Sequence, residues 1–251
     1  MGTINEIKKT VMVTGGTRGI GLSIVKKILS TGAYNVVFTY NKNKKIAEKI
    51  LSKQQSKINK FIACHLEQDN KESIKHAVDY AKSELDSSID ILINNAAMSQ
   101  EKKFFDINAN DWEKMLNVNL KGPFMLSQEI LPGMIEKRWG RIINISSVGG
   151  QWGGYRQVHY AASKAGLINF TKSLSNLFSD QGVTSNCISI GLVETDMSKN
   201  EINSSEGKEK IKNIPIGRIG NTNEIVDTVL FLCSNGSSYI TGQTINLNGG
   251  M

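Results

Sequence analysis

The chain has 251 residues, of which 39% are apolar and 7% aromatic, and its formal net charge is +7. This size suits a single domain over residues 1–251, and the absence of a basic, aromatic-interleaved stripe argues against a nucleic-acid surface. No apolar run approaches 18 residues, so no membrane span is expected. The positive excess then indicates either solvated lysine-rich faces or attraction of phosphate-bearing ligands.

Short apolar runs alternate with amphipathic stretches along the chain. Strands are predicted at about 10–16, 35–40, 60–66, 89–97, 141–147, 183–192 and 242–250. A helix follows the first strand, and further helices are predicted at about 43–57, 71–86, 111–137, 158–180 and 222–234. Continuous apolar strands between helices are typical of a parallel sheet covered on both faces. We therefore predict an α/β fold with a doubly wound parallel sheet of seven strands.

The segment 196–212 is polar and charged, and it is predicted to be a loop. Long polar loops in compact domains serve as lids over a site or are disordered. The sequence leaves both possibilities open.

Three cysteines, Cys64, Cys187 and Cys233, lie in separate apolar runs without a histidine or second cysteine at ligand spacing. No metal site is predicted. Buried free thiols fit a reducing compartment, and the first residues contain no apolar segment long enough for a signal peptide. A cytoplasmic location is expected.

The first predicted strand runs directly into TGGTRGIG (14–21). Gly15 permits a sharp turn, and Gly19 and Gly21 allow a phosphate and a neighbouring strand to approach the start of the helix. The N–H groups and the dipole at a helix N-terminus favour a pyrophosphate. Glycines alone are a weak signal, but a strand before them and a helix after them are the context of a dinucleotide site.

The end of the second predicted strand bears on which nicotinamide cofactor is bound. An NAD-preferring site places Asp or Glu there on the ribose hydroxyls, whereas TYNKNKK (39–45) contains no acid and the next acid is Glu48. The missing acid, together with Arg18 inside the glycine turn, favours a 2′-phosphate and therefore NADP(H). Lys42, Lys44 and Lys45 fit a solvated helix face equally well.

HYAASKAG (159–166) places Tyr160 and Lys164 four residues apart, so on a helix the phenol and the ammonium share a face. The pair is either a surface coincidence or a tuned proton donor. A free phenol has a pKa near ~10, and a neighbouring cation lowers it toward neutrality, where proton transfer is more efficient.

Five motifs, in order, resemble the short-chain dehydrogenase/reductase family: TGGTRGIG (14–21), NNAA (94–97), NVNLKG (117–122), NISSVGG (144–150) and YAASK (160–164). GLVETDM (191–197) and YITGQTINLNGG (239–250) are similar to its 3-oxoacyl-[acyl-carrier-protein] reductase branch. The resemblance covers essentially the whole chain. It implies a Rossmann-like fold, NADP-dependent oxidoreductase activity and a homotetramer.

The resemblance also implies the catalytic residues Asn119, Ser147, Tyr160 and Lys164. Tyr160 would be the general acid, and Lys164 would stabilise its phenolate and bind the nicotinamide ribose. Ser147 would hydrogen-bond the substrate oxygen; Ser146 points to the opposite side of a strand. Asn119 would hold a water of the proton relay, or it is a buried amide that satisfies the backbone.

Cofactor contacts carry over by position. They are Gly15, Thr17, Arg18, Gly19, Ile20, Gly21, Asn41, Asn95, Tyr160, Lys164, Val193 and Thr195. The family's adenine-side aspartate has no counterpart in CHLEQ (64–68), and spacing leaves Glu67 and Gln68 as candidates. Two further departures are Ala97 in place of glycine, which costs little if its φ is negative, and Ile190 in place of proline.

For the substrate, the resemblance implies reduction of a 3-oxoacyl thioester to a 3-hydroxyacyl thioester in fatty acid synthesis. Acyl-carrier proteins are acidic, so a reductase serving one needs exposed cations. Arg138 matches one basic docking position, but the partner position is Gln181, which leaves Lys172 or the lysines of 196–212 to compensate.

Other functions remain open. Within enzymes they are reduction of acetoacetyl-coenzyme A, or a short-chain dehydrogenase for another ketone or alcohol. From a different class, the chain would be a non-catalytic NADP-binding regulatory protein, against which the intact catalytic set argues. Trp152 and Tyr155 either line a substrate pocket or pack under their loop, and His159 is expected to be structural.

Overall fold

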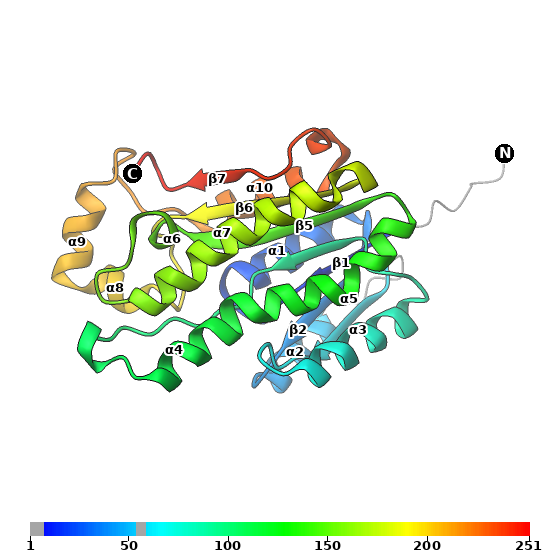
Figure 1. Cartoon of the computed structure of the whole chain (residues 1–251), viewed down its shortest axis with the longest axis horizontal. Helices are drawn as coiled ribbons and strands as arrows, with labels where there is room; N and C mark the ends of the chain where they lie inside the picture. The colour runs from blue at the N-terminus through cyan, green and yellow to red at the C-terminus, as the bar shows by residue number, and fades with distance from the viewer. Residues whose placement is uncertain (1–7, 54–58) are drawn as a thin grey trace.

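A computed structural model describes residues 8–53 and 59–251 of the chain. At its centre is one parallel sheet with the strand order β3-β2-β1-β4-β5-β6-β7 (Figure 1). The strands are β1 Lys9–Val13, β2 Tyr34–Tyr40, β3 Phe61–His65, β4 Ile91–Asn94, β5 Gly140–Ser147, β6 Val183–Ile190 and β7 Thr244–Leu247. All seven predicted strands are confirmed. The order reverses between β1 and β4, the point at which ligands bind in open α/β sheets.

Helices cover both faces of the sheet. They are α1 Gly19–Thr31, α2 Lys44–Lys53, α3 Lys71–Leu85, α4 Ala109–Leu116, α5 Gly122–Glu136, α6 Gly149–Trp152, α7 Val158–Phe178, α8 Lys199–Asn203, α9 Ser205–Lys212 and α10 Thr222–Cys233. Alternate residues of β1 serve the two cores. Val11 and Val13 pack with α1 and α10, whereas Met12 packs with α3 and α5. The predicted helix 43–57 is confirmed as far as Lys53, and residues 54–58 lie outside the described part.

The long helix predicted over 111–137 is divided in two. It begins at Ala109 because Asn108 and Asp111 form a reciprocal capping box. A π-helical turn, Asn117–Lys121, separates α4 from α5. Pro123 has no N–H to donate to the carbonyl of Asn119, four residues earlier, so the α-helical pattern cannot continue at this point.

The segment 196–212 differs from the predicted loop. It forms α8 and α9 instead, and Ser204 caps α9 by accepting a bond from the Gly207 N–H at 2.9 Å. Figure 1 shows both helices beyond the carboxyl ends of β6 and β7, near the C-terminus. In the described part of the chain, no helix combines the length and the apolar character needed to cross a membrane.

Candidate active site

Helix α7 is anchored to β5 by two hydrogen bonds. Lys164 Nζ donates to the Ile145 carbonyl at 2.7 Å, and Ser146 Oγ donates to the Lys164 carbonyl at 3.0 Å. Ser147, the last residue of β5, is half-buried and its Oγ accepts from the Gly149 N–H at 3.2 Å. The two serines therefore have separate surroundings, as strand alternation predicts, and only Ser147 lies at the open end of the strand.

Tyr160 and Lys164 share one face of α7. Lys164 Nζ lies 5.7 Å from the centroid of the Tyr160 ring. Only 3% of Lys164 is exposed, and this burial lowers the pKa of its ammonium group to about 8. Because charges interact more strongly away from water, an ammonium here stabilises a neighbouring phenolate more than an exposed one would. The pair can therefore release and recover a proton at the phenol oxygen.

The side chain of Asn119 connects three parts of the site. Its Oδ1 accepts from the Met98 N–H at 2.9 Å, and its Nδ2 donates to the Met98 carbonyl at 2.9 Å and to Ser163 Oγ at 3.1 Å. Ser163 Oγ in turn donates to the Tyr160 carbonyl at 2.7 Å. The amide is thus engaged with protein groups, so a relay water would have to rest on the main-chain carbonyl of Asn119. Ser163, which the sequence analysis did not identify, connects the Asn119 amide to the turn of α7 that carries Tyr160.

A second network holds the start of α7. His159 is fully buried and its Nε2 lies 3.1 Å from Gln100 Oε1, while Gln100 Nε2 donates to Asp111 Oδ1 at 3.3 Å. Lys102 pairs with the other oxygen of Asp111. Burial lowers the pKa of His159, so the ring is neutral at pH 7. The network fixes the residue next to Tyr160, and Gln100 and Asp111 were not foreseen from the sequence.

The glycine turn leaves the N-terminus of α1 accessible. Gly15 and Gly19 have φ of +68° and +53°. A Cβ at Gly21 would lie 2.2 Å from the Gly15 carbonyl oxygen, so only glycine fits there. Arg18, at the N-cap, provides no side-chain cap, and the first turn contains no acid. The first N–H groups of α1 therefore suit the oxygens of a pyrophosphate.

Thr14 joins the ends of β1 and β4 beside this turn. Its Oγ1 accepts from the N–H groups of Asn95 at 3.0 Å and Ala96 at 2.9 Å. Asn95 Nδ2 donates to the Thr14 carbonyl at 2.8 Å. Asn95, an expected cofactor residue, therefore also holds the ends of β1 and β4 together. Thr14 was not identified in the sequence analysis. Ala97 is not among the positive-φ residues, so its methyl group introduces no backbone strain.

Two more expected cofactor residues approach the turn from the loop after β6. Val193 is buried and pairs with Gly220 in a parallel bridge. The side chain of Thr195 would lie 3.8 Å from a Cβ at Gly19. Thr17 is buried and Ile20 half-buried within the turn itself. Residues from β1, α1 and the loop after β6 therefore meet at one place.

The structure separates the candidates for the adenine side. β2 ends at Tyr40, followed by exposed Asn41. Glu67 is exposed, whereas Gln68 is 6% exposed against Gly122, and no described group bonds to its amide. The rings at the actual ends of β2 and β3 belong to Tyr40 and His65, whose centroids are 5.8 Å apart. His65 was not foreseen as a candidate.

The structure also places three residues that were discussed for the substrate. Trp152 and Tyr155 are 58% and 99% exposed, so they do not pack under their loop. Arg138 lies before the first residue of β5, whereas Ser147 is its last. At about 3.3 Å per residue, roughly 25–30 Å separates Arg138 from the site. Arg138 donates through Nη2 to the Asp180 carbonyl at 2.8 Å.

Comparisons with known proteins agree with this geometry. A family described as enoyl-(acyl carrier protein) reductase matches residues 15–251. The 3-oxoacyl-[acyl-carrier-protein] reductase FabG of Aquifex aeolicus is 43% identical over 98% of this chain and 99% of its own. The protein of the same name from Vibrio harveyi is 37% identical over 97% of both chains.

The solved structure of a protein called gox2181 superposes with a TM-score of 0.91 at 27% identity, covering 97% of this chain and 95% of that one. Membership of the family implies a nicotinamide cofactor, for which the glycine turn has the required form. The chain belongs to the short-chain dehydrogenase/reductase family, in its 3-oxoacyl-[acyl-carrier-protein] reductase branch.

Proposed function

We propose that this chain is an NADPH-dependent reductase that converts 3-oxoacyl thioesters on acyl-carrier protein to 3-hydroxyacyl thioesters in fatty acid synthesis. The observation that carries the proposal is the buried Lys164 ammonium 5.7 Å from the Tyr160 ring, at the open end of β5. The names of the Aquifex and Vibrio relatives support the substrate class.

In this proposal NADPH, when bound, supplies the hydride that reaches the carbonyl carbon. The chain's own residues bind and protonate the carbonyl oxygen of the substrate. Ser147 Oγ and the Tyr160 hydroxyl donate hydrogen bonds to it, and Tyr160 transfers its proton to the developing alkoxide. The Lys164 charge stabilises the phenolate that remains. A water on the Asn119 carbonyl, to which Pro123 offers no N–H, then returns a proton toward Lys164.

The residues proposed to hold the cofactor surround the turn at the start of α1. They are Gly15, Thr17, Arg18, Gly19, Ile20, Gly21, Asn41, Glu67, Gln68, Asn95, Tyr160, Lys164, Val193 and Thr195. Preference for NADP(H) rests on exposed Arg18 in the glycine turn and on the absence of an acid between Tyr40 and Glu48. A guanidinium can bind a 2′-phosphate with two parallel hydrogen bonds.

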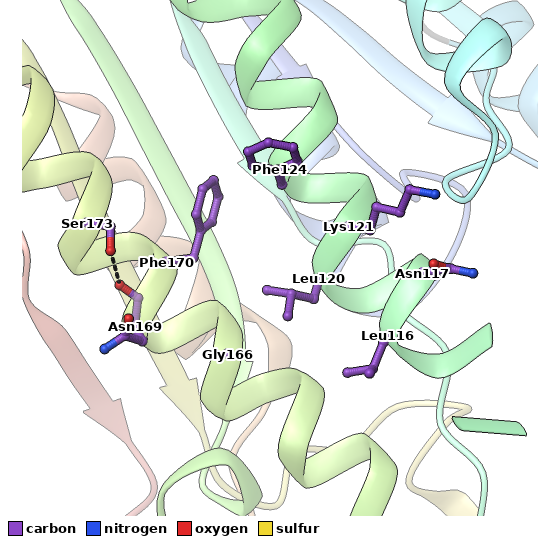
Figure 2. A pocket seen from close by; sticks show the side chains of 9 residues that line it. All are labelled: Leu116, Asn117, Leu120, Lys121, Phe124, Gly166, Asn169, Phe170 and Ser173. Atoms are coloured by element: carbon purple, nitrogen blue, oxygen red, sulfur yellow. Dashed lines mark hydrogen bonds between the residues drawn. The ribbon is translucent and has the colours of Figure 1, made fainter. Parts of the chain in front are cut away.

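We propose a homotetramer in which one contact uses the helices shown in Figure 2. A groove of about 450 Å³ lies between α7 and the stretch from α4 to α5. Figure 2 shows Leu120 and Phe170 pointing into the space between the helices, while Lys121 and Asn117 point away from α7. Phe124 is 43% exposed, and its ring centroid is 6.0 Å from that of Phe170. Such an apolar helical face favours association with a second copy.

The position of Arg138 adds a condition to carrier binding. Because Arg138 lies at the amino end of β5, it serves an active site only if that site belongs to a neighbouring copy. We propose that Arg138 binds the acidic carrier in this manner. A cytoplasmic location is proposed because Cys64, Cys187 and Cys233 are free thiols, as expected in a reducing compartment.

The test is a substrate panel with both NADPH and NADH, followed by loss of absorbance at 340 nm. Acetoacetyl groups on acyl-carrier protein and on coenzyme A are compared with a crotonyl thioester, since the family description names enoyl reduction. We expect oxidation of NADPH with the 3-oxoacyl substrates and best kcat/KM with the carrier. No activity on any thioester would favour another ketone or a non-catalytic NADP-binding protein.

Tyr160→Phe tests the role of the phenol directly. The variant retains the ring but not the proton, so we expect kcat to fall by a factor of at least about 10². Its Kd for NADPH, measured by fluorescence titration, should change little. A Tyr160→Phe enzyme that reduces ketones at the parental rate contradicts the mechanism.

A further inference from the structure

A second cavity lies at the amino ends of β5 and β6. Tyr160 lies near the opposite, carboxyl end of these strands. Its volume is about 370 Å³, and its lining includes Arg138, Trp139, Arg141, Ser179, Thr184 and Asn235. Neither the catalytic residues nor the glycine turn contribute to it. The cavity is therefore separate from the proposed active site, although it includes Arg138, the residue proposed to bind the carrier.

The unusual member of this lining is Arg141. Only 3% of the residue is exposed, and no ion pair joins it to an Asp or Glu of the described residues. Its Nη1 donates to the Gly140 carbonyl at 2.9 Å, but no described acceptor bonds to its Nε. Burying an unpaired charge is costly, so such a group normally has an anionic partner.

Among residues 8–53 and 59–251, no group is found that supplies Arg141 with a negative charge. The buried carboxylate of Asp90, which precedes β4, is held by Lys137 Nζ at 2.7 Å and by the Thr10 N–H at 2.8 Å. Burial lowers the pKa of Arg141, and the opposing groups are the Cys233 thiol and the Tyr34 phenol. Burial raises the pKa values of both, so both are neutral at pH 7.

Other cations gather around Arg141 instead. Its guanidinium carbon lies 4.3 Å from the centroid of the Trp139 ring, and Lys9 Nζ lies 3.6 Å from the same centroid. Arg138 lines the cavity as well. Thr184 adds a hydroxyl group to the lining, whereas the Ser179 hydroxyl already donates to the Ser175 carbonyl at 2.6 Å. The cavity thus combines positive charge with a short polar donor, a set that suits an oxyanion.

We propose that this cavity binds a phosphate-sized oxyanion, either free phosphate or the end of a small phosphomonoester. The anion neutralises Arg141 and accepts hydrogen bonds from Arg138 and the Thr184 hydroxyl. The volume exceeds that of phosphate alone, which leaves room for a short organic group.

Calorimetric titration with inorganic phosphate tests the site, at constant ionic strength and with the cofactor pocket filled by NADP⁺. We expect one phosphate per chain and a rise in Tm of about 3–6 °C at ten times the Kd. Glycerol 3-phosphate is the second probe. Tighter binding than phosphate identifies a phosphomonoester as the ligand, and equal or weaker binding identifies free phosphate.

Variants locate the binding. Arg141→Met should raise the Kd at least tenfold, and Thr184→Val, which keeps shape and removes a hydroxyl, should raise it severalfold. Lys172→Met removes an exposed lysine of α7 outside the cavity and should leave the Kd unchanged. The proposal is overturned if phosphate gives no heat, if NADP⁺ abolishes binding, or if Arg141→Met binds like the parent.

Discussion

At the scale of single residues, Lys164 carries its charge where almost no water reaches it. The lowering of its pKa from 10.5 to about 8 corresponds to a cost of about 3 kcal/mol in the folded chain at neutral pH. The hydrogen bond from Lys164 to the Ile145 carbonyl offsets about 1 kcal/mol of this cost. In the proposed mechanism, this destabilising cation is kept because it stabilises the phenolate of Tyr160.

Lys164→Met should separate stability from activity. We expect the free energy of unfolding at pH 7 to rise by about 1–2 kcal/mol, because the buried charge is removed and one hydrogen bond is lost. Turnover should fall below detection. Urea denaturation of the cofactor-free enzyme and the 340 nm assay measure the two effects. A variant less stable than the parent at pH 7 contradicts this account.

The pH dependence follows from the direction of the same pKa change. The folded chain binds fewer protons than the unfolded chain between pH 8 and 10.5, so the Lys164 contribution makes the parent more stable as pH rises through this window. The advantage of Lys164→Met is therefore full below pH 8 and shrinks above it. Lys172→Met, which removes an exposed lysine, should show no such dependence.

At the scale of elements, the two ends of α1 have glycines for different reasons. At Gly21 a Cβ would meet the Gly15 carbonyl oxygen at 2.2 Å and Asn95 Nδ2 at 2.5 Å. At Gly32, the C-cap, φ is +67° but nothing lies within 4 Å. The first glycine is required by close approach, and the second only by backbone conformation.

Gly21→Ala should therefore displace the glycine turn and raise the Kd for NADPH at least tenfold. Gly32→Ala is the matched control on the same helix. It should cost about 1 kcal/mol of stability through its left-handed conformation and leave the NADPH affinity unchanged. Fluorescence titration and thermal unfolding measure both. Equal NADPH affinities for the two variants would show that Gly21 is not constrained by the turn.

The elements that the sequence predicted are those with a local signal. The strands β1 to β7 are short apolar runs because helices bury both faces of the sheet. The helices α8 and α9 have only five and eight residues with polar sequences, so no periodicity distinguished them from a loop. The break between α4 and α5 follows from Pro123, a signal that is present in the sequence but that the apolar periodicity of 111–137 does not reveal.

Residues of the candidate site could be predicted where they belong to one sequence motif. Residues that are brought together only by tertiary contacts could not. Tyr160 and Lys164 lie in one motif, and the structure places them on one face of α7. Thr14 is hydrogen-bonded to Asn95, 81 residues away, and no local sequence pattern predicts such a contact. Ser163 and Gln100 belong to the same class, because they bond to partners on other helical segments.

At the scale of the whole molecule, the proposed tetramer uses the exposed apolar face between α5 and α7 as one contact. Phe124→Asp places a charge in that face, and we expect light scattering after gel filtration to show dimers in place of four chains of 27.6 kDa. Ile46→Asp alters an apolar residue on α2 that is 45% exposed, and it should remain tetrameric. Unchanged assembly of Phe124→Asp would show that this face is not a contact.

Arg138 lies roughly 25–30 Å from the active site of its own chain. In the proposed assembly it must therefore lie close to the active site of a neighbouring chain. Arg138→Glu should raise KM for carrier-bound substrate at least fivefold and leave KM for the coenzyme A thioester unchanged. This split distinguishes loss of carrier binding from damage to the catalytic centre, because the coenzyme A thioester has no acidic protein surface to repel.

Mixed oligomers decide whether Arg138 acts on a neighbour. In Arg138→Glu chains Tyr160 is intact, and in Tyr160→Phe chains Arg138 is intact. When the two are co-expressed and assemble at random, about half of the sites with Tyr160 receive Arg138 from the other chain. If Arg138 acts between chains, a fraction of the carrier activity with parental KM returns. If it acts within its own chain, every site with a working phenol lies in a chain that has lost the arginine, and the raised KM persists at any mixing ratio.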